Sequence, residues 1–206
     1  STASGIPDFR GPQGLWTRDP DAEKLSDIRY YVSDPAIRRK AWLARRDSPV
    51  WQASPGAGHD ALARFEQSGR LHTLVTQNID GLHQLAGSAE ERVIEIHGTL
   101  RQVACLQCNY RVAMAVVLKR LADGEEDPDC PDCGGILKSA TISFGQSLVA
   151  KDLARAEQAA RECDLLLAVG STLSVFPVAG LVPLARKAGA RVVIINAEPT
   201  AMDEFG

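Results

Sequence analysis

The chain has 206 residues, of which 45% are hydrophobic and 24% are charged, and its formal net charge is -3 at pH 7. This composition is that of an ordinary globular domain, and the weak charge argues against a nucleic-acid or acidic-lipid partner. No apolar run is long enough to span a membrane and no secretory signal opens the chain, so we expect a cytoplasmic location.

The first part of the chain holds an irregular region followed by helix and strand signals. Residues 17–57 are rich in Arg and Pro, and we expect a partly helical cap there. Residues 59–69 form an amphipathic pattern that ends at Gly69, a typical helix stop. Apolar runs at 71–76 and 92–98 then predict two strands, the second with period two.

The second half alternates helix and strand signals more clearly. An Ala-rich amphipathic helix is predicted at 148–162, and a second helical pattern at 175–189 ends in a glycine. Two near-continuous apolar runs, 163–170 and 190–196, are typical of strands buried on both faces. Strands that alternate with helices indicate βαβ units, which predicts an α/β fold with a parallel sheet and helices on both faces.

In such sheets ligands bind beyond the carboxyl ends of the strands, so the polar residues that follow each apolar run are candidate site residues. We expect all of them to meet at one edge of the sheet. They are Gln77, Asn78, Ile79 and Asp80, then His97 and Gly98, then Gly170, Ser171 and Thr172, then Asn196, Ala197 and Glu198.

Residues 101–138 interrupt this alternation and carry two Cys-x-x-Cys pairs, Cys105/Cys108 and Cys130/Cys133. The spacing predicts one tetrahedral zinc ion, and four thiolates leave no open position for water or substrate, so the zinc should be structural. The segment is therefore interpreted as an inserted module. The loop between the pairs contains the acidic run DGEEDPD, which argues against nucleic-acid binding.

His97 is either a core histidine or a catalytic base, because four cysteines leave it no place among the zinc ligands. A lone histidine is most often structural, but His97 lies at a predicted strand end, where ligands bind. The other histidines lack this context. We expect His59 and His72 to be solvated beside a helix, and His83 to be structural because it follows Asp80, which can cap a helix.

Several motifs together resemble the sirtuin family, in its bacterial branch. They are SGIPDFRGPQGLW, TQNIDGLHQLAG, EIHGT, the two Cys-x-x-Cys pairs, VGSTLSVFPVAG and INAEPT, in the family's order along nearly the whole chain. The resemblance implies an NAD-dependent protein-lysine deacylase that binds NAD and acyl-lysine in a cleft between two domains. It implies a Rossmann-like domain at 1–16, 58–100 and 139–206, an acyl-pocket cap at 17–57 and a zinc module at 101–138.

The resemblance also implies roles for individual residues. The chain opens within the family's cofactor loop, and we expect the preceding strand and a Gly-Ala-Gly segment before Ser1. Asn78 would position the NAD ribose and nicotinamide while the acyl oxygen attacks the ribose carbon, and His97 would take a proton from a ribose hydroxyl. The implied NAD contacts are Thr2, Ala3, Gly5, Asp8, Phe9, Arg10, Gln77, Asn78, Ile79, Asp80, His97, Gly170, Ser171, Thr172, Asn196 and Glu198.

The implied substrate contacts are Ile142, Phe144, Gly145, Val175, Trp42 and Arg45. Residues 143–146 would bind the substrate peptide by adding a strand to it, so that backbone hydrogen bonds carry the affinity. Sirtuins that remove succinyl or malonyl groups carry Tyr-x-x-Arg in the acyl pocket, where this chain has Trp42 and Arg45. Because Trp42 lacks the hydroxyl, we expect acetyl-lysine to be preferred over succinyl-lysine.

Two other functions fit parts of the sequence. The same fold can transfer ADP-ribose to a protein side chain, and the sequence separates this activity from deacylation poorly. A zinc-ribbon binding module on an inert scaffold predicts a basic patch, whereas the loop between the cysteine pairs is acidic. Asn78 and Asp80 could also simply cap a helix. The catalytic interpretation is favoured because all these residues converge on one sheet edge.

Overall fold

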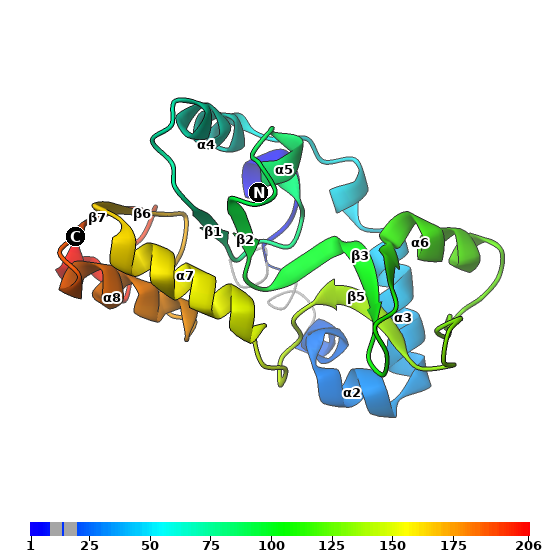
Figure 1. Cartoon of the computed structure of the whole chain (residues 1–206). Helices are drawn as coiled ribbons and strands as arrows, with labels where there is room; N and C mark the ends of the chain where they lie inside the picture. Colours follow the sequence, from blue (N-terminus) through cyan, green and yellow to red (C-terminus); the bar gives the residue numbers. More distant parts are fainter. Residues whose placement is uncertain (9–13, 15–19) are drawn as a thin grey trace.

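The computed structural model describes residues 1–8, 14 and 20–206 (Figure 1). Its α-helices are α2 (Ile28–Ser33), α3 (Pro35–Arg46), α4 (Ala57–Gln67), α5 (Leu82–Leu85), α6 (Met114–Ala122), α7 (Ala150–Glu162) and α8 (Leu181–Lys187). Its strands are β1 (Leu74–Thr76), β2 (Val93–Glu95), β3 (Gly98–Cys105), β4 (Arg111–Ala113), β5 (Leu137–Thr141), β6 (Leu165–Val169) and β7 (Arg191–Ile195). Short 3-10 helices include η1 (Thr2–Ser4) and η2 (Pro20–Ser26). Within the described residues, every helix is too short or too polar to cross a membrane.

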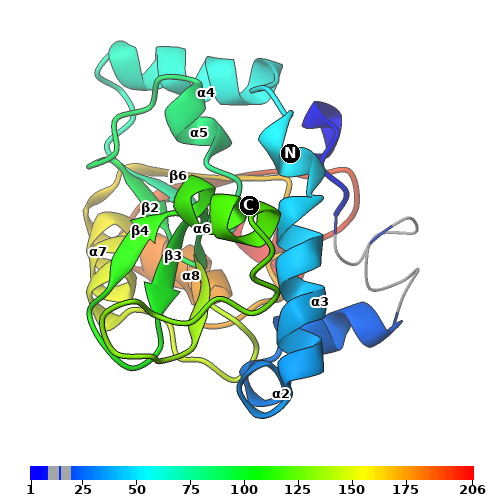
Figure 2. The same ribbon diagram turned by 90° about the vertical axis from the view of Figure 1, so that its right-hand side faces the viewer.

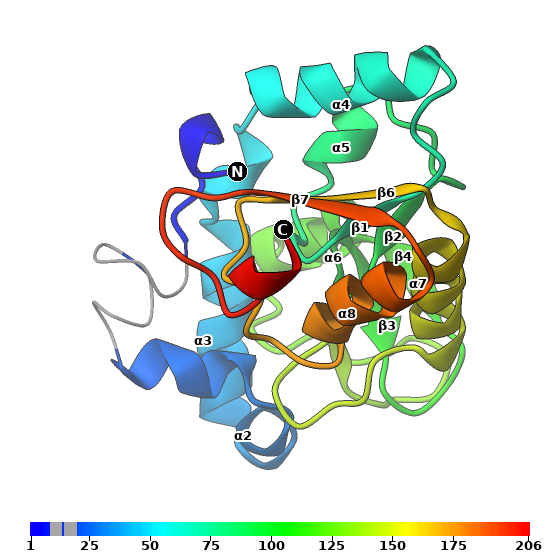
Figure 3. The ribbon, with the colours of Figure 1, turned by 90° about the vertical axis from the view of Figure 1, so that its left-hand side faces the viewer.

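Two pairs of parallel strands form the part of the molecule with the predicted βαβ units. β1 pairs with β2, with Leu74 opposite Val93, and β6 pairs with β7, with Leu165 opposite Arg191. α4 and α5 lie on one side of these strands, and α7 and α8 lie on the other (Figure 3). The predicted α/β class is confirmed, and in the described residues the parallel strands form two separate hydrogen-bonded pairs.

The Ala-rich face of α7 explains how this helix packs closely against the parallel strands. Ala156 and Ala160 are four residues apart, so they lie on the same face of the helix, and both are buried. They share a core with Ile94 and Ile96 at the end of β2, and α8 adds Ala185 to the same cluster. The small side chains allow the helix axes to approach the strands without leaving a void.

Among the residues that the structure describes, the apolar run that becomes β6 is covered on one face, so the predicted burial on both faces is not found there. Leu165, Leu167 and Val169 are 38%, 41% and 53% exposed. On β7, the alternate residues Val193 and Ile195 are exposed as well. Successive side chains of a strand point to opposite faces, and α8 packs on one of them. A continuous apolar run does not reveal how many faces a neighbouring helix covers.

The cysteine-bearing segment folds around an antiparallel sheet with the strand order β4-β3-β5. β3 begins at Gly98 and β5 ends at Thr141, so the sheet extends beyond the range 101–138 on both sides. α6 packs on this sheet and supplies Met114 and Val117 to a buried cluster that also contains Val103 of β3. This cluster is separate from those of the parallel strands.

The cap at residues 20–51 lies beside this sheet (Figure 2) and contains the α-helices α2 and α3 and the 3-10 helices η2 and η3 (Pro49–Trp51). Asp27 and Asp34 precede α2 and α3, and their side chains accept hydrogen bonds from Arg29 N and Ala36 N, both over 2.8 Å. These caps satisfy first-turn N–H groups and explain where the helices begin. Trp42 of α3 is 1% exposed within the core of the cysteine module, so the cap and the module share that core.

Candidate active site and metal centre

Hydrogen bonds join the polar residues that follow the parallel strands. Gln77, after β1, donates from Nε2 to Ser171 Oγ, after β6, over 3.3 Å. Gln77 O lies 3.2 Å from Nδ1 of His97, which follows β2. Gly170 N donates to Ile195 O at the end of β7 over 2.8 Å. The structure therefore brings the ends of four strands together, as expected for the binding edge of an α/β sheet.

His97 is half-buried in the turn between β2 and β3, and its tautomer follows from its partner. A carbonyl oxygen only accepts, so Nδ1 carries the hydrogen that is donated to Gln77 O, and the neutral ring keeps Nε2 unprotonated. Burial lowers the pKa of His97, and the Gln77 carbonyl partly offsets this effect. At pH 7 the ring is therefore neutral, and its Nε2 makes no hydrogen bond within the described residues. A general base requires this state.

The glycine that follows His97 in the EIHG motif, Gly98, is required by the backbone at this position. Its φ is +72°, and a Cβ at this position would lie 2.1 Å from Ala140 O on β5. Only glycine allows β3 to begin so close to β5. Ile142 N also donates to His97 O over 2.8 Å, so the turn of His97 is joined to the segment that leads into residues 143–146.

Asn78 is exposed, whereas Asp80 is 4% exposed and has a structural role in addition to any other. Asp80 Oδ1 accepts from Leu82 N at the start of α5 over 2.9 Å, and Asp80 O accepts from Arg101 Nε over 2.8 Å. Asp80 therefore satisfies the first N–H group of α5, but the residue at the N-cap position is Gly81. Ser1 Oγ donates to Asp80 Oδ2 and accepts from Asn78 Nδ2, which brings the first residues of the chain against the end of β1.

The remaining NAD candidates lie in three loops. Thr2 and Ala3 are exposed in η1, which ends at Gly5 with φ +82°, and Asp8 is exposed. Phe9 and Arg10 lie outside the described residues.

After β6, Thr172 is exposed and its Oγ1 lies 2.8 Å from Ser174 Oγ. After β7, Asn196 Nδ2 donates to Glu198 O over 2.8 Å, and Glu198 is exposed. Ile79, near the end of β1, accepts at its carbonyl from Leu100 N over 2.8 Å. Amide and hydroxyl groups at strand ends can donate to phosphate oxygens, and carboxylates can accept from sugar hydroxyls, so these residues fit NAD.

In residues 143–146, the segment expected to bind the substrate peptide, Phe144 already pairs with the cap. Phe144 N donates to Ser26 O over 2.8 Å, and Ile28 N donates to Phe144 O over 3.0 Å, so the cap pairs with this segment. Gly145, the next residue, makes no backbone hydrogen bond within the described residues. Its φ is +81°, and Gln146 N donates to Ser143 O over 3.0 Å, so residues 143–146 form a turn here and not an extended strand. Ile142 is half-buried beside His97, and Val175 is half-buried in the loop after β6.

Trp42 and Arg45 line a small cavity between the cap and β5. Its volume is about 10 Å³, which is the space for a single water molecule. Trp42 Nε1 is buried and has no hydrogen-bond partner among the residues that the structure describes. The lining residues are Leu25, Tyr31, Ala41, Trp42, Arg45, Lys138, Ser139 and Ser143, a set with two cations and no carboxylate.

Lys138 is a residue of this cavity that sequence analysis missed. It is 4% exposed, and its Nζ donates to Ser139 O over 3.1 Å and to Thr141 O over 2.5 Å. Burial lowers the pKa of Lys138 to about 7, and the charge of Arg45 adds to this effect. A lysine in a strand is normally exposed, and no local pattern signals that this one is buried.

The four cysteines of the two pairs come together in one cluster. The Sγ atoms of Cys105 and Cys133 lie 3.6 Å apart, as do those of Cys108 and Cys130, and all four lie within 4.8 Å of one another. Tetrahedral zinc with Zn–S bonds of about 2.3 Å separates its sulfur ligands by roughly 3.8 Å, so the cluster fits one zinc ion. A disulfide would require about 2.05 Å. The predicted four-cysteine zinc site is confirmed.

Two histidines that sequence analysis set aside form a buried pair. The rings of His59 and His83 lie 4.9 Å apart between centroids, and each residue is 8% exposed. The prediction that His59 is solvated is wrong, because Gly56 N donates to its Nδ1 and draws the ring against α5. Burial lowers the pKa of His83 to about 4, with His59 adding to the effect. Only tertiary packing brings the two together, so no spacing in the sequence signalled the pair.

A comparison of the sequence with models of protein families found a matching model. The model is described as Sir2 family, and it matches residues 1–177. The chain belongs to the Sir2 family. The resemblance to sirtuins found in the sequence motifs is thereby confirmed.

Curated Sir2 relatives match the chain over its whole length. NAD-dependent protein deacetylase 2 of Streptomyces coelicolor is 52% identical over 205 residues, which cover 100% of this chain and 85% of that protein. NAD-dependent protein deacetylase 1 of Pyrobaculum aerophilum is 42% identical over 207 residues, which cover 100% of this chain and 78% of that protein.

Solved Sir2 structures share the fold. A Sir2 complex with a p53 peptide and NAD+ has a TM-score of 0.86 at 33% identity and covers 100% of this chain and 81% of that one. A Sir2 variant with a deacetylated p53 peptide and 3'-O-acetyl-ADP-ribose has a TM-score of 0.88 at 33% identity, with coverages of 100% and 81%.

Proposed function

We propose that this Sir2-family chain removes acetyl groups from lysine side chains of proteins and consumes NAD as co-substrate. The products are nicotinamide, free lysine and O-acetyl-ADP-ribose. The names of the curated relatives support this activity, and so do the related Sir2 structures that contain NAD, an acetylated peptide or acetyl-ADP-ribose. The zinc ion in the four-cysteine site is structural, because four thiolates fill its coordination sphere.

The observation that carries the proposed mechanism is the state of His97. The Gln77 carbonyl fixes the hydrogen on Nδ1, so Nε2 is free to accept a proton from a ribose hydroxyl of the co-substrate. When bound, NAD supplies the electrophilic ribose carbon that takes the acyl oxygen. Because burial lowers the pKa of His97, the ring remains available as a base at and somewhat below pH 7.

The other residues of the strand ends position the co-substrate. Asn78, which is exposed beside His97, orients the ribose and nicotinamide. Ser171, held by Gln77, contacts ribose and phosphate, and Asn196 contacts the adenine ribose. The remaining proposed NAD contacts are Thr2, Ala3, Gly5, Asp8, Phe9, Arg10, Ile79, Asp80, Gly170, Thr172 and Glu198.

The acyl-lysine peptide binds on the other side of His97. Its backbone hydrogen-bonds to residues 143–146, where the N–H and the carbonyl of Phe144 already pair with the cap. Ile142 and Val175 flank the lysine chain, and Trp42 and Arg45 close the acyl pocket. In this proposal residues 17–57 form the acyl-pocket cap, residues 101–138 form the zinc module, and residues 1–16, 58–100 and 139–206 form the NAD-binding domain.

We also propose that the enzyme acts in the cytoplasm. Its zinc site needs four reduced thiols, and a reducing compartment keeps them so. Fractionation of cells that express the protein, followed by immunodetection, tests this location.

The activity is tested by measuring nicotinamide release with and without an acetyl-lysine peptide. Release that depends on the peptide, with deacetylated peptide and O-acetyl-ADP-ribose seen by mass spectrometry, is the expected result. Release without peptide, with ADP-ribose attached to a protein side chain, would instead show the ADP-ribosyltransferase activity that the fold also allows.

A further inference from the structure

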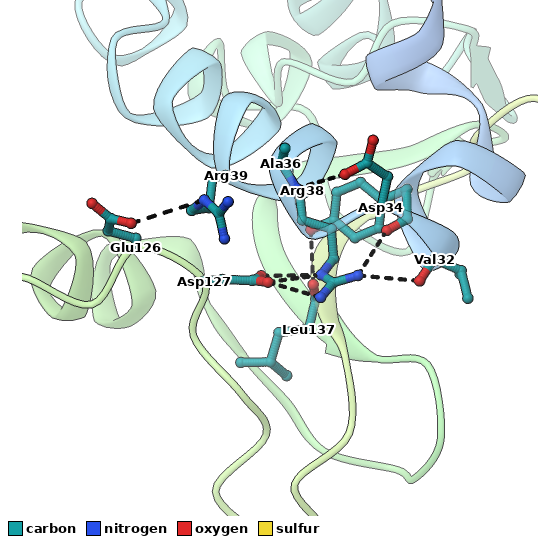
Figure 4. Close-up of polar contacts among 9 residues, drawn as sticks. Val32, Asp34, Ala36, Arg38, Arg39, Glu126, Asp127 and Leu137 are labelled. Carbon is teal, nitrogen blue, oxygen red and sulfur yellow. Dashed lines mark hydrogen bonds and ion pairs between the residues drawn. The ribbon is translucent and has the colours of Figure 1, made fainter.

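Arg38 of α3 contacts two other segments of the chain at once (Figure 4). Its Nε donates to the two carboxylate oxygens of Asp127 over 3.1 and 3.0 Å, and its Nη2 lies 2.8 Å from Oδ2. Its Nη1 donates to Tyr31 O and Val32 O over 3.3 and 3.1 Å. One planar guanidinium therefore joins α3 to the last turn of α2 and to the loop that follows α6.

A neighbouring ion pair between the same helix and the same loop differs in burial. The side chains of Arg38 and Asp127 are 12% and 21% exposed, whereas those of Arg39 and Glu126 are 44% and 81% exposed, with a closest distance of 3.8 Å. Removing one partner of a buried pair leaves an unpaired charge in a poorly solvated site, while an exposed pair contributes little. The second pair is therefore a built-in control for the first.

The loop that carries Asp127 is connected to the zinc site. Asp127 lies three residues before Cys130, the first ligand of the second cysteine pair. Between them, Asp129 forms an antiparallel bridge with Ile136, and Cys130 N donates to Gly135 O over 2.8 Å. The second cysteine turn thus determines where the carboxylate of Asp127 stands, and zinc holds that turn in place.

The other end of the pair leads to the acyl pocket. Arg38, Trp42 and Arg45 are spaced by four and three residues, so they lie along one face of α3. Trp42 packs in the core of the zinc module, and Arg45 lines the cavity that also contains Lys138. Tyr31, whose carbonyl Arg38 binds, lines the same cavity and donates from its hydroxyl to Leu137 O on β5 over 2.8 Å. A displacement of α3 therefore changes the shape of this cavity.

We propose that the Arg38–Asp127 ion pair positions α3 against the zinc module, so that an intact four-cysteine site keeps Trp42 and Arg45 in place in the acyl pocket. Arg38 and Asp127 are positioning residues, since neither contacts the reacting groups. The role of the pocket rests on the proposed function, whereas the mechanical connection between zinc and α3 does not. The two parts are tested separately.

Hydrogen exchange tests the connection without any activity assay. Amide exchange in Pro35–Arg46 is measured for the zinc-loaded wild type, for Asp127→Asn and for the control Glu126→Gln, and for the wild type treated with a chelator. Asp127→Asn should accelerate exchange in α3 by about 2- to 30-fold with zinc still bound, the range expected for loss of one coupling contact. Chelation should accelerate the same amides in the wild type. Equal exchange in Asp127→Asn and Glu126→Gln would overturn the proposal.

The rate of zinc release tests the reverse effect, that of α3 on the metal site. If α3 and the second cysteine turn stabilise each other, Arg38→Gln should release zinc to a chromogenic chelator about 2- to 30-fold faster than the wild type. Arg39→Gln, one residue further along the same helix, should release zinc at the wild-type rate. Unchanged release from Arg38→Gln would show that the helix does not support the metal site.

Kinetics then test the effect on the pocket. Asp127→Asn should raise the KM for an acetyl-lysine peptide by about 2- to 30-fold while leaving the KM for NAD and zinc content unchanged. A general loss of folded enzyme would lower kcat and leave both KM values alone, which would contradict a positioning role. A wild type without deacetylase activity would refute the proposed function, while the exchange and zinc results would still decide whether the ion pair connects zinc to α3.

Discussion

The zinc module with its cap and the parallel-strand region are held together by different interactions. In the module, four thiolates surround one metal site, Trp42 fills a common core, and a partly buried ion pair joins cap to loop. In the parallel-strand region, the polar strand ends are joined by single hydrogen bonds such as Gln77 to Ser171, and one face of β6 and β7 is exposed. The candidate catalytic histidine lies in this second region.

This difference shows that support and chemistry are separated in the molecule. The region with the strongest cross-links contributes no group to proton transfer, while the region with the candidate base contributes no ligand to the metal. Substitutions in the two regions should therefore fail in different ways. A change in the module should alter structure and zinc content, and a change at the strand ends should alter turnover in an intact fold.

The largest effect is expected for Cys105→Ala. A structural zinc site contributes roughly 10–16 kcal/mol to the folding of small zinc modules, which is as large as the stability of an entire domain. Loss of one thiolate should therefore release the metal and unfold residues 101–138. Zinc content by mass spectrometry and limited proteolysis within that range measure the outcome. Cys163→Ala is the control, because its thiol lies outside the cluster, and a zinc-loaded, protease-resistant Cys105→Ala would contradict the assignment.

His97→Ala should show the complementary failure. A positioned general base typically contributes about 10²- to 10⁴-fold to the rate, so deacetylation should fall by that factor. Zinc content and melting temperature should stay at wild-type values and NAD should still bind, because within the described residues His97 contacts no metal ligand and its ring makes one hydrogen bond. His72→Ala, an exposed histidine, serves as the control. Loss of zinc from His97→Ala would contradict the inference that the candidate base and the metal site are independent of each other.

The parts of this division that could be predicted from sequence are those encoded by short spacing. The two Cys-x-x-Cys pairs predict the metal cluster, and the position of His97 directly after a period-two run places it at a strand end. The glycine after His97 has an equally local cause, since a side chain there would collide with β5.

The parts that could not be predicted depend on contacts between distant residues. Arg38 and Asp127 are 89 residues apart in the chain, and each looks like an ordinary surface charge in its own segment. The burial of Lys138 and of the His59–His83 pair likewise depends on which helices pack over them. The exposed face of β6 was missed for the same reason, because an apolar run records a preference for burial but not the neighbour that provides it.

Lys138, which is buried beside the zinc module, should make the free energy of unfolding depend on pH. Its pKa is about 7 in the folded protein and about 10.4 when unfolded, so between these values the unfolded chain binds more protons and stability rises with pH. This contribution is absent from Lys138→Met. From pH 7 to pH 10 the free energy of unfolding of the wild type should therefore gain about 2–4 kcal/mol relative to Lys138→Met. Urea unfolding of both zinc-loaded proteins across this range measures the difference, and parallel pH profiles would show that Lys138 stays protonated in the fold.

The smallest effect concerns acyl choice, where the two regions meet at the pocket. We predict that acetyl-lysine peptides react about ten- to a hundredfold faster than succinyl-lysine peptides, because Trp42 lacks a hydroxyl to share a carboxylate with Arg45 and a charge-assisted hydrogen bond is worth ~1.5–3 kcal/mol. The cavity beside them, about 10 Å³, also leaves no room for a carboxylate. Trp42→Tyr adds the hydroxyl and removes ring volume, so it should raise the succinyl-to-acetyl rate ratio. Initial rates with matched acyl peptides at equal concentration provide the measurement. Faster succinyl turnover by the wild type would instead mean that the cavity opens and that the unpartnered Trp42 Nε1, with Arg45 and Lys138, binds the carboxylate.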